Sequence, residues 1–240
     1  MKGHPCTIAS TTQTLMPSRP DSRNQPTAEG VSAILARCRL SVSLAQASQL
    51  AAYLQMLMHW NSRMNLVGPR DWRTVCASLV VDSIHLAAVI PELDLPGAPS
   101  TLDIGAGAGL PGIPLRICWS RGRYIMLEPR QKRAVFLHTL LARLELPGTE
   151  VRRQSAEAFG LSGVPADLIL SRGVRPWPEF LDMTRPLIKE GGLVIVFSNQ
   201  PWSQDLAVPA GWGSPTEMAY ATAEGRTRYF WLFSPNMSPS

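Results

Sequence analysis

The stretch LDIGAGAGLPGIP, residues 102–114, decides the fold class. An apolar run leads into a glycine cluster and then into two prolines, which predicts a strand, a tight turn and the start of a helix. Units of this kind build parallel sheets covered by helices, and ligands bind beyond the carboxyl ends of their strands. The turn over residues 104–112 is therefore the first candidate site.

The glycines of this turn fit two cofactors. Gly107, Gly109 and Gly112 satisfy the dinucleotide pattern G-x-G-x-x-G. In another frame, Asp103 and Gly105 open the pattern D-x-G-x-G-x-G, the loop that holds S-adenosylmethionine in many methyltransferases. The glycines alone leave both readings open.

A carboxylate follows the next predicted strand. Glu128 ends the apolar run over residues 123–127, 21 residues after Gly107. A carboxylate at this place can accept hydrogen bonds from both hydroxyls of a ribose. It serves NAD and S-adenosylmethionine alike, so Glu128 is a cofactor-binding candidate under either reading.

Three features favour S-adenosylmethionine. Asp103 lies at the end of a buried strand, where a dinucleotide site prefers an apolar residue, and a carboxylate there can hold a methionine amino group or a loop amide. Residues 217–233 predict a hairpin, and hence an antiparallel edge. The stretch LIKEGGLVIV, residues 187–196, resembles the helix, Gly-Gly turn and fifth strand of class I methyltransferases. A dinucleotide-dependent oxidoreductase remains the alternative.

The remaining pattern alternates strands and helices. Strands are predicted over residues 101–104, 123–127, 150–153, 166–170 and 193–197, and helices over 113–119, 130–146 (with Val135 in its core stripe) and 178–188. The predicted fold is α/β, a class I methyltransferase-like doubly wound sheet with an antiparallel C-terminal hairpin over residues 96–240. A helical region over residues 31–95 precedes it, with helices after Ser43 and Asp71. Residues 1–30, rich in Ser, Thr and Pro, are predicted to be a disordered tail.

Composition limits the partners. The 240 residues carry a net charge of +5, which permits an anionic partner without proving one. The four cysteines form no C-x-x-C pair, so neither a zinc site nor a redox pair is predicted and no metal is expected. A run of about 18 apolar residues and a secretory signal are not found. The expected location is the cytoplasm, away from membranes.

Six motifs occur together in the central part of the chain. They are HWNSRMNLVGPRD (59–71), VVDS (80–83), LDIGAGAGLPGIPL (102–115), LEPRQKRAVFL (127–137), SAEAF (155–159) and LILSR (168–172). As a set, they resemble the bacterial small-subunit ribosomal RNA methyltransferase G family, also called glucose-inhibited division protein B. The resemblance covers roughly residues 40–197. It implies transfer of a methyl group from S-adenosylmethionine to N7 of a guanine in 16S rRNA, with naked RNA or the small ribosomal subunit as partner. The enzyme is expected to be a monomer.

The resemblance also implies roles for single residues. Gly105 and Leu110 would line the cofactor, Ala156 and Glu157 would flank its adenine, and Arg172 would face the methyl donor or the RNA as the catalytic candidate. Basic residues near the strand ends would bind RNA: Arg130, Lys132, Arg133 and Arg175. Two tryptophans of the same half, Trp177 and Trp202, are expected to anchor loops rather than to stack a base.

The missing motifs agree with this chemistry. Neither an N/D-P-P-Y motif nor a Pro-Cys pair follows the fourth strand, so methylation of an exocyclic amine and the covalent pyrimidine route are not indicated. Guanine N7 carries an in-plane lone pair and needs orientation rather than a base.

The chain departs from the family at Ser78 and Leu79, where Arg-His is usual, and at Ser198 and Asn199, where the family tends to carry Leu-Lys-Gly after strand five. These departures keep two alternatives open: another RNA as substrate, and a non-catalytic RNA-binding relative.

Overall fold

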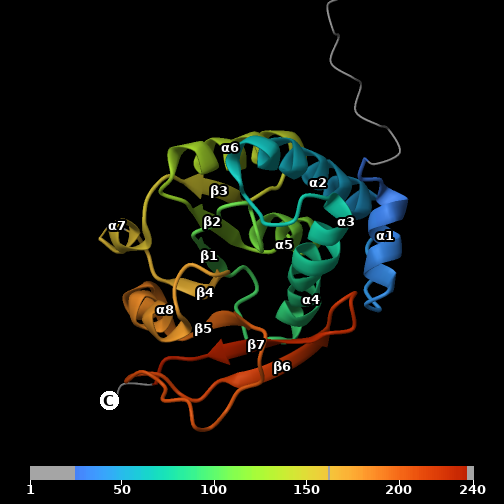
Figure 1. The fold of residues 1–240 in the computed structure, drawn as a ribbon. Coiled ribbons are helices and arrows are strands. Elements are labelled where there is room, and N and C mark those ends of the chain that lie inside the picture. The colour runs from blue at the N-terminus through green and yellow to red at the C-terminus, as the bar shows by residue number, and fades with distance from the viewer. Residues whose placement is uncertain (1–24, 162, 237–240) are drawn as a thin grey trace, which may run out of the picture.

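A seven-stranded sheet forms the centre of the molecule, with helices on both faces (Figure 1). The computed structural model describes residues 25–161 and 163–236. The strands are β1 (Ser100–Ile104), β2 (Arg123–Leu127), β3 (Thr149–Arg152), β4 (Ala166–Ser171), β5 (Ile188–Ser198), β6 (Thr216–Ala221) and β7 (Thr227–Phe233). Their order is β3-β2-β1-β4-β5-β7-β6. The first five are parallel, whereas β7 runs antiparallel to both β5 and β6. The predicted class I methyltransferase fold with its terminal hairpin is confirmed.

The α-helices are α1 (Ala28–Ala36), α2 (Leu44–Met64), α3 (Trp72–Val75), α4 (Val81–Val89), α5 (Gly112–Cys118), α6 (Gln131–Leu144), α7 (Ala156–Gly160) and α8 (Trp177–Thr184). Of these eight helices in the described part of the chain, four, α1, α2, α3 and α7, start at a residue whose side chain caps them. Ser43 begins α2 with a full capping box, its side chain accepting from the Gln46 N–H. Asp71 caps α3 through the Thr74 N–H. Both predicted helix starts are confirmed.

A π-helical segment, Cys76–Val80, joins α3 to α4. In it, the Val81 N–H bonds the carbonyl of Cys76, five residues back. Such single π-turns inside α-helices are rare and frequently occur at functional sites. Here the turn lies within hydrogen-bond reach of the arginines described below, since the carbonyls of Ser78 and Leu79 accept from them.

Three expectations from the sequence are wrong in detail. The predicted tail ends early, because α1 begins at Ala28 with Thr27 as its cap; residues 1–24 lie outside the described part. The helix predicted to run to Ile188 ends at Thr184, and Gly191–Gly192 lies inside β5 rather than in a turn before it. Val135, expected in the core stripe of α6, is 48% exposed, since the buried face of this helix is formed by its neighbours Ala134, Phe136 and Leu137.

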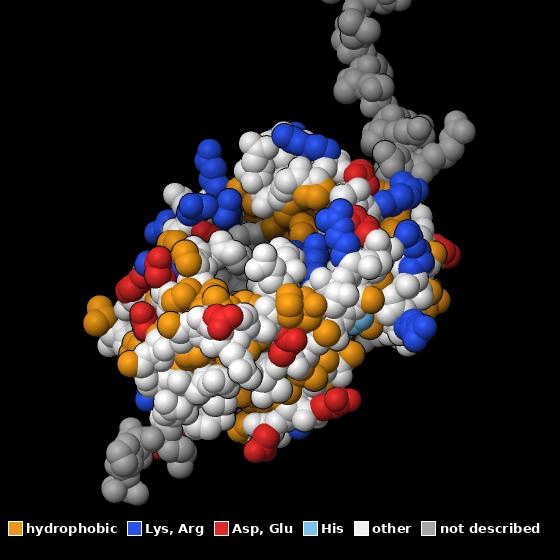
Figure 2. Space-filling model, turned by 60° about the horizontal axis from the view of Figure 1, so that its bottom comes forward, with side chains coloured by type: hydrophobic (Ala, Val, Ile, Leu, Met, Phe, Trp, Pro, Cys, Tyr) orange, Lys and Arg blue, Asp and Glu red, His pale blue; other side chains and the backbone are white. Residues whose placement is uncertain are grey.

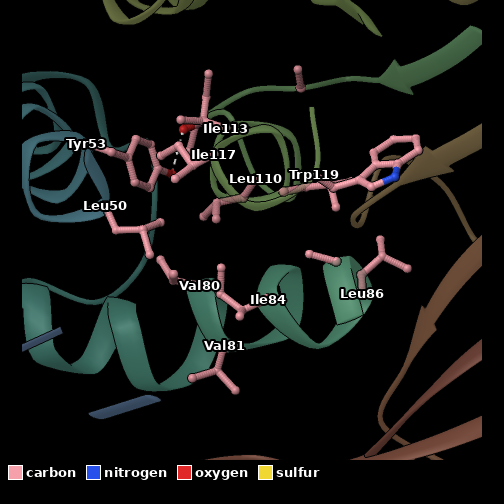
Figure 3. Packing of buried hydrophobic residues seen from close by; sticks show 14 of the residues in the cluster. Leu50, Tyr53, Val80, Val81, Ile84, Leu86, Leu110, Ile113, Ile117 and Trp119 are labelled. Atoms are coloured by element: carbon pink, nitrogen blue, oxygen red, sulfur yellow. Dashed lines mark hydrogen bonds between the residues drawn. The ribbon is translucent and has the colours of Figure 1, made fainter. Parts of the chain in front are cut away.

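One hydrophobic core joins the N-terminal helices to the sheet. Apolar side chains of α1, α2, α4, α5 and α6 pack with residues of β2, β4, β5 and β7 in a single cluster. Figure 3 shows α2, α4 and α5 meeting around Leu50, Val80, Ile84 and Ile113. In the same region the Tyr53 hydroxyl of α2 donates to the Ala108 carbonyl of the glycine turn at 3.0 Å. The N-terminal helices therefore support the turn directly, and the boundary at residues 95/96 stays a prediction.

The other face of the sheet carries α7 and α8. There Trp177 lies between Trp202 and Phe233, with ring centroids 5.5 and 5.7 Å from its own, and Trp202 lies 5.1 Å from Trp231. These aromatic contacts hold the long segment after β5 against the sheet. The expectation that Trp177 and Trp202 anchor loops is confirmed.

The helical segment Trp72–Glu92 needs separate mention. Among the described residues, it alone is long and apolar enough to cross a membrane, with a mean hydropathy of 1.7, and half of its apolar window is buried within the fold. It packs against α1 and α5. Its apolar side chains thus have partners in the core, and the absence of a membrane span stays a prediction.

Candidate active site

A cavity of about 330 Å³ lies at the carboxyl ends of β1, β2 and β4. Its walls come from the glycine turn, from the segments after β2 and β3, and from residues 172–175 after β4. Figure 2 shows Lys and Arg side chains gathered on both sides of a hollow in the upper half of that view. The carboxyl ends of the parallel strands, where this cavity lies, are the place at which ligands bind in doubly wound sheets.

The glycine turn is shaped by three left-handed residues. Gly105, Gly107 and Gly109 have φ angles of +70°, +51° and +77°, which side-chain-bearing residues rarely adopt. At Gly105 a Cβ atom would overlap the Cγ2 atom of Val174. Gly105 lines the cavity, whereas Gly109 packs against Ile113. The turn therefore needs glycine both for its backbone and for close approach.

Leu110 does not reach the cavity. Its side chain is buried in the core beside Ile113 and Ile117 (Figure 3). Leu110 thus fixes the end of the glycine turn from behind, through packing. Its predicted contact with the cofactor stays a prediction.

Glu128 holds the turn to the next strand. It is only 2% exposed, and its Oε2 accepts from the Gly107 N–H at 3.0 Å while Oε1 accepts from the Arg130 N–H at 2.9 Å. Each carboxylate oxygen keeps a further lone pair for a ligand. The predicted pairing of Glu128 with the glycine turn is therefore present, at the edge of the cavity.

Asp103 lies at the end of the buried strand β1, as expected, but its side chain points away from the cavity. It is fully buried, accepts from the Tyr124 hydroxyl at 3.2 Å and lies against Gly112 at the start of α5. Burial raises the pKa of Asp103 to about 7, although the Tyr124 hydroxyl and the Gly112 amide oppose the shift. It does not line the cavity. Of the two roles expected for Asp103, holding a loop amide fits this position and contact with a methionine amino group does not.

The segment after β3 forms the opposite wall. Ser155 caps α7 by accepting from the Ala158 N–H, which places Ala156 and Glu157 on the cavity wall as expected. Sequence reasoning missed Gln154, which also lines the cavity and whose buried Nε2 has no hydrogen-bond partner among the described residues. A buried amide donor without a partner is costly unless a ligand or water satisfies it.

Arg172 lines the cavity, but its guanidinium faces the N-terminal helices. Nη1 lies 2.7 Å from Oδ2 of Asp82 on α4, and the nitrogens also approach the carbonyls of Ser78 and Leu79. Arg228 of β7 meets the same carboxylate at 2.6 Å. Asp82, only 1% exposed, thus joins α4, the end of β4 and the hairpin. Asp82 belongs to the VVDS motif, but the sequence indicated no pairing of Asp82 or Arg228 with Arg172, because they lie 90 and 56 positions from it.

The predicted RNA-binding residues separate into two groups. Arg130, Arg133 and Arg175 line the cavity together with Arg172. Lys132 is exposed on α6 and does not line it. Arg175 forms an exposed ion pair with Glu157 at 3.0 Å. Three of the four predicted residues therefore surround the opening, and their contact with RNA stays a prediction.

The described residues contain no candidate metal site. Within residues 25–161 and 163–236, His, Cys, Asp and Glu side chains form no group of three suited to a metal ion. The cysteines in these ranges are unpaired, and burial raises the pKa of Cys76 and of Cys118 to about 12. Such thiols are poor nucleophiles at neutral pH.

Comparison with known proteins decides between the two cofactor classes. The model of the family described as rRNA small subunit methyltransferase G matches residues 46–207. The chain belongs to this family. The dinucleotide-dependent oxidoreductase, kept as an alternative from the glycine pattern, is therefore wrong.

Relatives and solved structures agree with the family. A ribosomal RNA small subunit methyltransferase G from Nitratidesulfovibrio vulgaris is 50% identical over 191 residues, 80% of this chain and 86% of the relative. Another from Oleidesulfovibrio alaskensis is 42% identical over 213 residues, 85% of this chain and 93% of the relative. The structure of an O-methyltransferase from Bacillus cereus in complex with SAH covers 76% of this chain and 90% of its own, with a TM-score of 0.52 and 18% identity. At this level of identity, the similarity to the Bacillus cereus enzyme concerns the fold alone.

Proposed function

We propose that this chain transfers the methyl group of S-adenosylmethionine to N7 of a guanine in 16S rRNA. Membership of the rRNA small subunit methyltransferase G family carries the proposal. The site supports it, since the family's glycine turn opens into a cavity lined by Glu128 and four arginines. A non-catalytic relative would not need this cavity to be kept.

The cavity fits the parts of S-adenosylmethionine. Glu128 offers free lone pairs to a ribose, Ala156 offers a flat apolar wall to an adenine, and the unpartnered Gln154 amide offers a donor beside it. Arg133 provides positive charge for a carboxylate. When bound, the cofactor supplies a methyl group activated by its sulfonium.

The residues of the chain orient the reaction rather than move protons. Guanine N7 already carries a lone pair, so the N–C bond forms as the C–S bond breaks and no proton has to leave. An in-line displacement of this kind gains chiefly from orientation. Arg172 lines the cavity, and Asp82 holds its guanidinium on the side of the N-terminal helices. Because a cation close to a sulfonium would repel it, the partners of Arg172 are anionic or carbonyl-like groups of the cofactor or the RNA.

Several finer points belong to the proposal. We take the substrate to be 16S rRNA, naked or in the small ribosomal subunit, the location to be the cytoplasm, and the enzyme to act as a monomer. Phosphate contacts by Arg130, Arg133 and Arg175 would supply most of the RNA affinity. Another RNA remains the second candidate, because Ser198 and Asn199, at the end of β5, replace residues usual in the family.

Mass mapping of 16S rRNA tests the proposal. RNA from a strain lacking the gene should lose one methyl group from one guanine, and the purified chain should restore it in vitro. An unchanged methylation map, together with tight binding of S-adenosylmethionine, would leave a methyltransferase with another RNA substrate.

A further inference from the structure

A second cavity, of about 430 Å³, lies beyond the carboxyl ends of β4 and β5. It shares Gly173, Val174 and Arg175 with the cofactor cavity. We propose that this second cavity takes the acceptor guanine, turned out of the RNA, with the side-chain amides of Asn199 and Gln200 on the edge of the base remote from N7. This inference rests on the proposed function and names its acceptor site.

The shared wall is thin. Val174 packs its Cγ2 atom directly against Gly105 of the glycine turn, yet the residue stays 40% exposed. Its neighbour Gly173 has a φ of +70°, and a Cβ atom there would meet nothing within 4 Å. The two cavities are thus direct neighbours at this short loop. Since methyl transfer requires the reacting atoms to lie about 3–3.5 Å apart, the base would have to meet the methyl group past the edge of this loop.

The lining suits a flat base. Among the residues that line it, Trp177, Phe180, Phe197 and Trp231 are aromatic. Enzymes that act on a base turn it out of its stack into such a pocket, between aromatic or apolar side chains. Arg175 is the one charged residue on this wall and can meet the phosphate beside the base.

The lining also contains no base for catalysis. Neither a carboxylate nor a histidine, lysine or cysteine is among the described residues that surround this cavity. An exocyclic amine would need a group to take its proton, whereas N7 of guanine has no proton to lose. The chemistry of the walls therefore matches attack by N7.

The amides lie where guanine needs acceptors. With N7 directed at the cofactor cavity, N1–H and the 2-amino group lie on the opposite side of the base, and both donate. Asn199 and Gln200 are exposed at the rim, and their side-chain amides form no hydrogen bond within the described part of the chain. Each amide carries a carbonyl oxygen able to accept from these donors.

The test measures single-turnover transfer of labelled methyl to small ribosomal subunits and to naked 16S rRNA, both from a strain lacking the enzyme. For Asn199→Ala combined with Gln200→Ala, we expect kcat/KM to fall about tenfold, the scale of one or two neutral hydrogen bonds. Affinity for S-adenosylmethionine, measured by calorimetry, should stay at the parent value. Gln204→Ala is the matched control, because Gln204 lies in the same exposed segment and does not line the cavity.

The outcomes separate the two proposals. If the parent methylates neither substrate, the proposed function fails. If the parent is active and the double variant reacts as fast as Gln204→Ala, the acceptor site lies elsewhere. A second measurement irradiates 16S rRNA that contains 6-thioguanosine, bound to the parent with S-adenosylhomocysteine. Cross-links within residues 173–177 or 196–200 support the second cavity, and cross-links confined to other segments overturn it.

Discussion

Asp82→Asn should destabilise the protein strongly. The substitution keeps the shape of the side chain but removes the charge that Arg172 and Arg228 share, at N–O distances of 2.7 and 2.6 Å. The arginine side chains are 23% and 16% exposed and Asp82 is almost fully buried, so solvent cannot replace the lost partner well.

The magnitude follows from this burial. Breaking a buried ion pair on one side costs about 3–5 kcal/mol. Both guanidinium groups keep the carbonyl of Ser78 as a partner, so we expect the lower end, about 3 kcal/mol. For a chain of this size that corresponds to a fall in Tm of roughly 6–12 °C.

Urea unfolding followed by circular dichroism measures the effect. The control is Glu224→Gln, which removes an ion pair with Arg226 at 3.5 Å between exposed side chains and should change the free energy of unfolding by less than about 0.5 kcal/mol. If Asp82→Asn changes the free energy of unfolding by less than about 1 kcal/mol, the upper limit for exposed ion pairs, the carboxylate does not hold the two arginines as described.

Three further predictions concern the cofactor cavity and its support. Gly107→Val should abolish binding of S-adenosylmethionine in calorimetry while cooperative unfolding persists, because φ is +51° at this position and the backbone N–H bonds Glu128; normal binding would remove the turn from the site. Arg133→Ala should weaken binding of S-adenosylhomocysteine about tenfold, as expected for a lost charge-assisted hydrogen bond, whereas Lys132→Ala, one residue away and outside the cavity, should not. Asp103 has a folded pKa of about 7 against 3.8 unfolded, so the folded state binds more protons between these values and the free energy of unfolding falls as pH rises from 4 to 7. Asp103→Asn should flatten that fall in urea titrations at several pH values, and an unchanged slope would show that Asp103 ionises normally.

Local signals made most of the fold predictable. Ser43 and Asp71 cap helices through their own side chains, and the apolar run before Gly105 forms β1, so neighbours in sequence suffice to identify these elements. Gly191–Gly192 misled because β5 continues past both glycines to Ile188, which pairs with Ala166 of β4 across an irregularity in the register. That pairing depends on a distant strand.

In the candidate site, too, residues placed by their sequence neighbours were predictable, whereas contacts between distant parts of the chain were not. Glu128 was identifiable because it follows a strand and a glycine turn at a fixed spacing. The partner of Arg172 was not, since Asp82 comes from a helix in another part of the chain and meets it only after α4 packs against the sheet. Asp103 shows the converse: its position was predicted correctly, but the pleat of β1 turns its side chain towards Tyr124 and away from the cavity.

The π-turn at Cys76–Val80 sets the rotational phase of α4. Each residue of an α-helix advances its side chains by about 100° around the axis, so the extra residue taken up by the turn determines which side of α4 faces the arginines. Removing one residue from Cys76–Val80 would restore regular α-helical bonding there and swing Asp82 by about a quarter of a revolution. Arg172 and Arg228 would then lose the Asp82 carboxylate, although every residue that touches the cavity would be unchanged. The number of residues in this short segment therefore matters more for the position of Asp82 than the identity of their side chains.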